Sequence, residues 1–478
     1  MPFNNLESKR VFEIFEQIAS IPHGSGNMDA IAAFCENFAK RLGLSCIRDT
    51  ANNVIIFKDG TLGYENLEPI ILQGHLDMVC QKESGCNIDF EKDGLELYVD
   101  GDFLKARGTT LGADNGIAVA MTLAILERND LSHPPIEAVF TVDEETGMGG
   151  AISIDTSVLK GTRMINLDSE TEGLVTVSCA GGSNFQVLLP LKTKKVSGTP
   201  ITIDINGLLG GHSGDKINKC RINANLLAGR ILNEIKAFPF DIISINGGDK
   251  SNAIPNHCVV ELCTKHHEDI SLALSRLYQA LKIEFSDNEK DFAMTISVGQ
   301  SGEFLCFEDD LKSKLIYTLV CVPNGVTEMS AKINGLVQTS LNLGILLTSN
   351  NTLELQFALR SSKMAALEFL EKRLCVFFDM LQLPYKTFGH YPAWEYQENS
   401  TLRDTYCETY KAITKTDAKV IAIHAGLECG VFASKIKDFD CISIGPQMYE
   451  IHTTRERLSI SSTEALYKIL LSFLEKLK

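Results

Sequence analysis

Carboxylate and imidazole side chains stand where apolar, strand-like runs of this chain end or where glycine-rich loops begin. They are His75 and Asp77 in GHLDMV, Asp114 in GTTLGADNG, Glu144 and Glu145 in DEETGMGG, Asp168 in LDSE, and His452 in EIHT. Imidazole nitrogens and carboxylate oxygens are the usual protein ligands of zinc, and they also suit manganese and cobalt. Because one carboxylate can bridge two ions, the ordered set predicts a site for two divalent metal ions.

Each of these residues also has an ordinary explanation when it is taken alone. The pair His75 and Asp77 could be a hydrogen-bonded surface pair, and Asp114 could cap the helix that follows it. Asp168 could shape a turn, and a single histidine such as His452 is more often structural than a metal ligand. The chemistry is therefore inferred from the whole set in its α/β setting.

The adjacent glutamates Glu144 and Glu145 follow Asp143, so three carboxylates stand in succession. Like charges at contact distance repel one another, which indicates a positive partner nearby. Two divalent ions carry four positive charges, which three ligand carboxylates and one hydroxide would balance, and such a site favours an extra carboxylate beside the hydroxide. Neighbouring residues of a strand face opposite ways, so the pair must lie where the strand breaks at the following glycines. One glutamate can then bind metal while the other handles protons.

The elements that must position these residues alternate between helical and strand-like patterns. Over about the first 180 residues, short apolar runs such as EPIILQGHLD and IEAVFTVDEE alternate with helical patterns such as NMDAIAAFCENFAKRLGL. This order predicts an α/β sheet flanked by helices, in which functional residues gather at the strand ends.

The pattern of expected strands and helices changes in the middle part of the chain. Residues 185–393 show strand-like runs with longer helical patterns, and the alternation typical of an α/β domain returns after 394. We therefore predict one α/β domain made of residues 1–184 and 394–478, with an α+β domain inserted at 185–393. Two stretches of the insertion, one beginning at SNAIPNHCVVELC and one at SLNLGILLTSN, each give a strand-like run, a polar break and an amphipathic helix. This similarity predicts an internal duplication.

Composition excludes several classes of function. With 478 residues, a formal charge of −16 and 44% hydrophobic residues, the chain is expected to be globular, with two or more domains. No concentrated basic face favours nucleic acid or an anionic membrane, and no apolar run reaches the length of a membrane span. The 14 cysteines lack a CxxC pair, which predicts reduced thiols and a cytoplasmic location.

The motifs together resemble a known family. GHLDMV, GTTLGADNG, DEETGMGGA, LDSE and EIHT, with GGHSGD in the insertion, are similar to the dinuclear zinc metallopeptidases that include aminoacylase, carboxypeptidase G, peptidase T and peptidase V. The longer runs LQGHLDMVCQK, GTTLGADNGIAVA and HAGLECGVF are most similar to the Xaa-His dipeptidases of that family. The resemblance covers essentially the whole chain. It implies a zinc-peptidase-like mixed sheet flanked by helices, with the inserted domain acting as a lid.

The resemblance also implies roles for individual residues. Asp114 would bridge two metal ions, with a cis peptide bond following it. Glu145 and His452 would complete one metal site, and His75 and Asp168 the other. Asp77 would orient the His75 ring, Glu144 would be the general acid/base for a bridging hydroxide, and His212 in GGHSGD would donate to the oxyanion. Without the resemblance, GGHSGD reads as a glycine-rich turn.

A dipeptidase must also bind a free carboxylate. Arg360 in QFALRSS and Asn252 in KSNAIP match the substrate-carboxylate positions of the family, although Arg360 alone could equally be a surface ion pair. Gly426 in HAGLECG is expected to line the same pocket. Glu428 could contact the substrate's amino terminus or pair with Arg360, and the sequence leaves both open.

The sequence therefore predicts a metal-dependent dipeptidase, of the Xaa-His type, with two divalent ions and a dipeptide as its partner. An amidohydrolase of N-acyl amino acids or a dipeptidase of other specificity remains an alternative, as does a non-catalytic metal-binding scaffold. A scaffold is disfavoured because it would not need Glu144. The chain could be a monomer or a homodimer, with His212 acting within one chain or across an interface.

Overall fold

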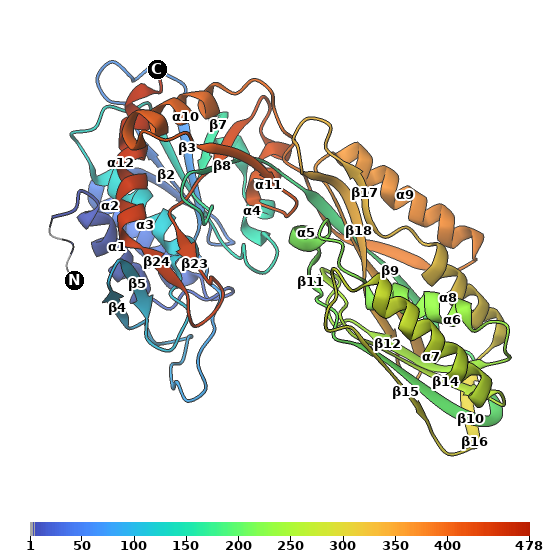
Figure 1. Cartoon of the computed structure of the whole chain (residues 1–478). Helices are drawn as coiled ribbons and strands as arrows, with labels where there is room; N and C mark the ends of the chain where they lie inside the picture. The colour runs from blue at the N-terminus through green and yellow to red at the C-terminus, as the bar shows by residue number, and fades with distance from the viewer. Residues whose placement is uncertain (1–2, 4) are drawn as a thin grey trace. The chain divides into compact units, whose positions relative to one another are not determined.

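A computed structural model describes residue 3 and residues 5–478 of the chain. The chain divides into two compact units, shown in Figure 1. The first unit comprises Met1–Ser178, Trp394–Ala422 and Leu427–Lys478, and the second comprises Cys179–Ala393 and Ile423–Gly426. The first boundary thus falls six residues before the predicted one, the second falls at the predicted position, and four residues near 425 also group with the second unit.

A mixed sheet organises the first unit, in the strand order β1-β2-β6-β3-β7-β22-β8-β21. Its strands are β1 (Ser45–Arg48), β2 (Val54–Lys58), β3 (Ile70–His75), β6 (Ile136–Thr141), β7 (Arg163–Asn166), β8 (Leu174–Cys179), β21 (Lys419–Ile423) and β22 (Asp440–Ser443). The four central strands, β6, β3, β7 and β22, run parallel to one another. Strand β2 pairs antiparallel with β1 and β6, and β8 pairs antiparallel with β22. Every residue of β3 and β6 is buried, as expected for strands covered on both faces.

Helices of the first unit share one hydrophobic core with this sheet. They are α1 (Lys9–Ala19), α2 (Asp29–Leu42), α3 (Ala113–Glu127), α10 (Thr401–Thr414) and α12 (Ile460–Lys476), with α4 (Gly149–Ser153) and α11 (Glu428–Lys435) nearby. Helix α3 is apolar on all sides, which explains why it is buried along nearly its whole length. A small sheet of β23 (Met448–Tyr449), β24 (Arg457–Ser459), β5 (Phe103–Ala106) and β4 (Leu97–Asp100) completes the unit.

The second unit is built on a ten-stranded sheet. Its strands are β9 (Gly181–Pro190), β10 (Thr193–Asn206), β12 (Asp241–Gly247), β14 (Cys258–Thr264), β15 (Ala293–Val298), β16 (Gly302–Phe307), β17 (Gly325–Met329), β18 (Val337–Thr348), β19 (Thr352–Ser361) and β20 (Tyr385–Tyr391). They pair antiparallel, and alternate residues of strands such as β10 are buried, so one face of the sheet carries the core.

Four helices cover this core: α6 (Ala224–Glu234), α7 (His267–Glu284), α8 (Asp309–Cys321) and α9 (Met364–Met380). A short ribbon of β11 (Gly211–His212) and β13 (Ala253–Ile254) leads into α5 (Ser213–Lys216). The expected α/β fold with an inserted α+β unit is confirmed. The order of strand, break and helix is also seen twice, as β14 then α7 and as β19 then α9, while the duplication itself stays a prediction.

No helix formed by the described residues is long and apolar enough to cross a membrane. The structure contains the fourteen cysteines as thiols. Seven of them are exposed or only partly buried, and the other seven are buried.

Candidate metal centre

The register of the parallel strands brings several predicted residues to one edge of the sheet. His75 is the last residue of β3 and lies opposite Thr141, the last residue of β6. Gln73 lies opposite Asn166 at the end of β7, so Asp168, two residues later, reaches the level of His75. Carboxyl ends of parallel strands are the usual location of ligand sites in such sheets.

Asp114 reaches the same place from the start of α3. The helix is preceded by Gly112, whose φ of 67° lies in the left-handed region that favours glycine. The peptide bond between Asp114 and Asn115 is cis, which confirms the expectation from the family resemblance. The Asn115 side chain accepts a hydrogen bond from the His75 N–H and donates one to the Leu167 carbonyl, so it ties the helix start to the ends of β3 and β7.

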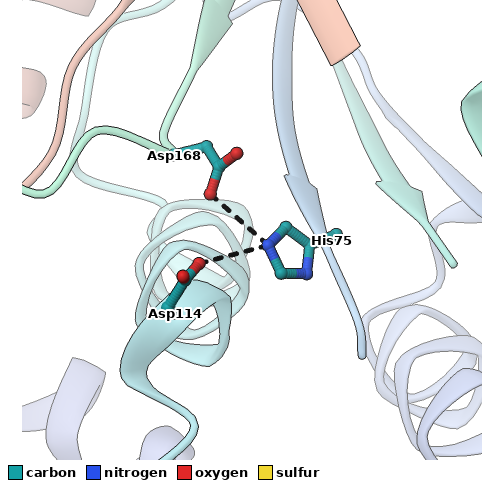
Figure 2. A group of neighbouring side chains, drawn as sticks. All are labelled: His75, Asp114 and Asp168. Atoms are coloured by element: carbon teal, nitrogen blue, oxygen red, sulfur yellow. Dashed lines mark hydrogen bonds and ion pairs between the residues drawn. The ribbon is translucent and has the colours of Figure 1, made fainter. Parts of the chain in front are cut away.

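The two oxygens of Asp114 face two different imidazoles. His75 Nε2 lies 3.2 Å from Asp114 Oδ1 and 3.4 Å from Asp168 Oδ1. Both contacts are drawn as dashed lines in Figure 2. His452 Nε2 lies 3.1 Å from Asp114 Oδ2 and 2.8 Å from Glu145 Oε1. Asp114 therefore stands between two sets of donors.

Three groups of these side chains have ligand atoms close enough to hold a metal ion. They are His75 with Asp114 and Asp168, Asp114 with Glu145 and His452, and His75 with Glu144 and Glu145. Within each group the atoms lie within 4.8 Å of one another. Asp114, His75 and Glu145 each belong to two of the groups, and Glu144 belongs to one. Among the three, only Asp114 has two carboxylate oxygens that each face a different imidazole.

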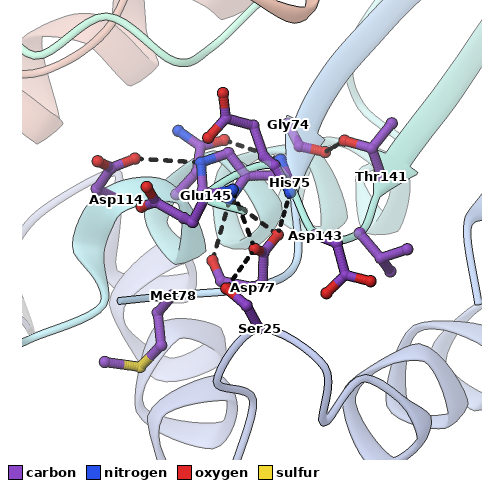
Figure 3. A network of polar contacts seen from close by, with 12 residues as sticks. Ser25, Gly74, His75, Asp77, Met78, Asp114, Thr141, Asp143 and Glu145 are labelled. Carbon is purple, nitrogen blue, oxygen red and sulfur yellow. Dashed lines mark hydrogen bonds and ion pairs between the residues drawn. The ribbon is translucent and has the colours of Figure 1, made fainter. Parts of the chain in front are cut away.

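Asp77 organises the strand ends around His75, as Figure 3 shows. Its Oδ1 lies 3.5 Å from His75 Nδ1 and also accepts the backbone N–H of Glu144 at 3.1 Å. Its Oδ2 accepts the backbone N–H of Glu145 at 3.2 Å and the Ser25 hydroxyl at 2.8 Å. The sequence predicted only the contact with His75. One buried carboxylate in fact holds the imidazole and the backbone of both glutamates.

The electrostatics of the cluster fit a divalent cation. Burial raises the pKa of Glu144 to about 8, and the Glu428 carboxylate adds to the rise. Burial likewise raises the pKa of Asp168 well above its usual range, with Asp114 adding to it. Burial alone would lower the pKa of His75, but the Asp168 and Asp114 carboxylates raise it well above 6.5. This buried surplus of negative charge and the nitrogen and oxygen donors together suit divalent metal ions.

The second unit contains a buried arginine without an acidic partner. Arg360 is 8% exposed, its Nε has no hydrogen-bond partner, and no carboxylate of the described chain forms an ion pair with it. Its Nη1 donates to the Tyr391 hydroxyl at 2.8 Å, and its Nη2 lies 3.4 Å from His212 Nε2. Arg360, Tyr391 and Asn252 line one cavity of about 430 Å³. The alternative of a surface ion pair for Arg360 is therefore wrong.

His212 lies on the β11–β13 ribbon, where it pairs with Ala253 next to Asn252. Loss of water around the ring lowers the pKa of His212, and the Arg360 guanidinium lowers it further. A neutral imidazole whose Nε2 accepts from Arg360 carries its proton on Nδ1. The structure therefore brings three of the predicted residues, His212, Asn252 and Arg360, together within the second unit.

Gly426 and Glu428 have surroundings that the sequence did not indicate. A Cβ at Gly426 would lie 2.8 Å from the Tyr391 ring, so the glycine admits that ring. Glu428 is buried in the first unit, where its Oε2 accepts hydrogen bonds from Gln73 Nε2 at 2.5 Å and the Thr141 hydroxyl at 2.7 Å. Among the described residues Glu428 forms no ion pair with Arg360, and its contact with the amino terminus of a substrate stays a prediction. A polar residue inside the apolar run of β3, such as Gln73, was the only available hint.

A family model described as peptidase family M20/M25/M40 matches residues 71–476 of the chain. The cytosol non-specific dipeptidase of Escherichia coli (strain K12) is 34% identical over 480 residues, which cover 99% of both chains. Among solved structures, the aminoacylhistidine dipeptidase from Vibrio alginolyticus superimposes with a TM-score of 0.92 at 32% identity, covering 99% of this chain and 98% of that one.

A more distant structure shares the fold alone. The aminopeptidase PepT from Bacillus cereus ATCC 10987 superimposes with a TM-score of 0.57 at 13% identity, covering 99% of both chains. The two relatives above 30% identity thus match the chain from end to end, including the second unit.

Replacing Asp114 with alanine should lower the zinc content of the protein to about half of the wild-type value or less, because this carboxylate serves two of the three groups. The measurement is the zinc content after loading and dialysis. Asp143→Ala is the matched control, since Asp143 accepts a hydrogen bond from the Gly26 N–H and belongs to none of the groups. Wild-type zinc content in Asp114→Ala would contradict the assignment.

Proposed function

Since this chain belongs to peptidase family M20/M25/M40 and is a dipeptidase of that family, we propose that it hydrolyses free dipeptides, those ending in histidine among them, with two divalent metal ions. The observation that carries the proposal is the Asp114 carboxylate, whose two oxygens face His75 and His452. The names of both close relatives support a dipeptide substrate, and one of them supports histidine as its second residue.

We assign Asp114 as the bridging ligand, with Glu145 and His452 on one side and His75 and Asp168 on the other. The distances between these side chains support the assignment, and the mixture of imidazole and carboxylate favours zinc, with manganese or cobalt also compatible. When bound, two such ions polarise the substrate carbonyl and lower the pKa of a water molecule. Asp77 supports the site by orienting the His75 ring.

Glu144 is our candidate for the general acid/base. Its backbone is held by Asp77, and its carboxylate lies within the group that contains His75 and Glu145. In this role Glu144 takes a proton from the attacking water and passes it to the departing amine nitrogen. The water oxygen bonds to the carbonyl carbon as this proton leaves, which puts negative charge on the carbonyl oxygen. The carbon–nitrogen bond breaks in a second step, as Glu144 gives the proton to the amine nitrogen.

Arg360 is our candidate clamp for the carboxylate of the dipeptide. A buried guanidinium without a counter-charge is costly, and a carboxylate ligand would satisfy it with hydrogen bonds. Asn252 lines the same cavity and can add a contact. His212, with its proton on Nδ1, is the candidate donor to the oxyanion. These roles require the second unit to act as a lid over a bound dipeptide, in the same chain or in a second copy.

We propose that the protein works in the cytoplasm. The name of the Escherichia coli relative places that protein in the cytosol. The fourteen cysteines are thiols in the structure, and thiols persist in a reducing compartment.

The first test is the initial rate of hydrolysis of β-alanyl-histidine and of a dipeptide without histidine. Protein loaded with zinc, manganese or cobalt should release amino acids, whereas chelator-treated protein should not, because the carbonyl and water are then not activated. N-acetyl-histidine serves as the control for an amidohydrolase. Hydrolysis of N-acetyl-histidine alone, or equal rates with and without metal, would refute the proposal.

The variant Glu144→Gln should lose about 10²–10⁴-fold in kcat, because an amide cannot accept the proton. Its zinc content should stay near the wild-type value, since Glu144 is not one of the proposed ligands. Asp143→Asn, an identical chemical change at the preceding residue, should keep wild-type activity. Full activity of Glu144→Gln would remove the general-base role.

The variant Arg360→Ala should lower kcat/KM for ordinary dipeptides by about 30-fold or more, because a charged, buried hydrogen-bonding partner is worth about 2 kcal/mol or more. The loss should be much smaller for the same dipeptides with an amidated carboxyl end. Arg230→Ala, which removes an exposed arginine of the same unit, is the control. Equal losses on the free and the amidated substrates would exclude the clamp.

A further inference from the structure

Glu456 contacts the backbone of the loop that carries Asp114. Its Oε2 accepts hydrogen bonds from the N–H groups of Leu111 and Gly112, at 2.7 and 3.1 Å. Its Oε1 accepts them from Ala113 and Asp114, at 2.9 and 3.4 Å. Four consecutive amides therefore converge on one carboxylate, and the last of them belongs to the proposed bridging ligand.

The shape of the loop explains this convergence. Gly112 has left-handed backbone angles, and a turn of this kind points successive N–H groups toward one place. The space beside Gly112 is filled, since a Cβ there would lie 2.8 Å from Met78 Sδ. The same amides form the start of α3, where N–H groups lack partners within the helix and the helix dipole favours an anion.

The hydrogen bonds from these four amides offset the cost of burying the Glu456 carboxylate. The residue is 3% exposed, and no lysine or arginine of the described chain forms an ion pair with it. A buried carboxylate is costly unless hydrogen bonds replace the lost water. The contact is therefore expected to fix both partners, the Glu456 side chain and the 111–114 backbone.

The position of Glu456 in the chain adds a second link to the metal centre. His452 and Glu456 lie in one loop between β23 and β24, two strands that pair with each other. The N–H of Glu456 donates to the Thr453 carbonyl at 3.1 Å, which closes a turn between them. This loop thus contacts Asp114 twice, through His452 at the side chain and through Glu456 at the backbone.

We propose that Glu456 is a positioning residue of the metal centre, which fixes the backbone of Asp114 relative to the loop that carries His452. Glu456 touches neither an ion nor the substrate in this role. It keeps the Asp114 carboxylate at the distance and angle at which the oxygens face His75 and His452. The inference rests on the proposed metal site and adds to it a residue that no ligand position includes.

A cap on helix α3 without any effect on the metal site is the competing explanation. A cap would influence thermal stability, whereas a positioning residue would also influence metal affinity and the geometry of the bound ion. Cobalt reports both quantities, because its visible absorption depends on the arrangement of its ligands. The full-length protein can therefore be titrated with Co²⁺ while the spectrum is recorded.

Two variants separate the explanations. Glu456→Gln keeps the length of the side chain but replaces one accepting oxygen by an NH₂ group, which faces two of the four N–H donors. It should bind Co²⁺ about 10–100-fold more weakly than the wild type, with an altered visible spectrum. Glu456→Asp keeps both accepting oxygens on a shorter side chain. Its affinity for Co²⁺ should therefore lie between that of the wild type and that of Glu456→Gln. An effect of side-chain volume alone would give the opposite order of the variants.

Glu450→Gln is the matched control, because Glu450 is an exposed acid of the same loop that pairs with Arg455 and Arg457. It should show wild-type cobalt affinity and spectrum. The proposal is overturned if Glu456→Gln melts at a lower temperature yet binds Co²⁺ with the wild-type affinity and spectrum. If Glu456→Gln does not fold, wild-type cobalt binding by Glu456→Asp overturns it, and several-fold weaker binding supports it.

The wild type distinguishes a failure of this inference from a failure of the proposed function. Wild-type protein that binds no Co²⁺ would refute the metal site itself. Wild-type protein that binds Co²⁺ like the variants would refute only the role of Glu456.

Discussion

The two oxygens of the Asp114 carboxylate face imidazoles from distant parts of the chain, and much of the first unit serves this contact. His75 is held at the end of a buried parallel strand, where its ring can move little. Asp114 starts a helix that is buried along nearly its whole length, so its backbone is fixed by the core. Asp77 and Asn115 then tie the neighbouring strand ends and loops to these two residues. The site therefore depends on the packing of the entire sheet edge.

The second unit presents a different electrostatic problem. The first unit gathers excess negative charge, whereas the second buries the positive Arg360 without an acid beside it. Tyr391 is uncharged, but its hydroxyl accepts a hydrogen bond from Arg360 and so fixes one end of the guanidinium. Gly426 leaves room for the Tyr391 ring. The first unit is thus suited to cations, and the cavity of the second is suited to an anion such as a carboxylate.

The sequence predicted well those features that are set by local patterns. His75 and Asp168 could be placed because apolar runs end just before them, and parallel strands end at one edge. Contacts between residues far apart in the chain were predicted only where the family resemblance supplied them, as for His452 with Asp114. For Glu428 the sequence left two contacts open and did not indicate the one with Gln73, which lies 355 positions earlier. The start of the insertion was placed six residues late, because β9 continues the strand-like texture of β8 without a change in composition.

The strand order of the first unit has a consequence for the synthesis of the protein. Strand β22 lies between β7 and β8, although it is made more than 250 residues after them. The sheet therefore keeps a gap until nearly the whole chain has left the ribosome, and His452 emerges later still. The second unit is almost continuous and has its own core, so it can fold while the first unit is still open. Premature termination would thus release a folded insertion on an unfinished sheet, with an exposed strand edge that invites aggregation.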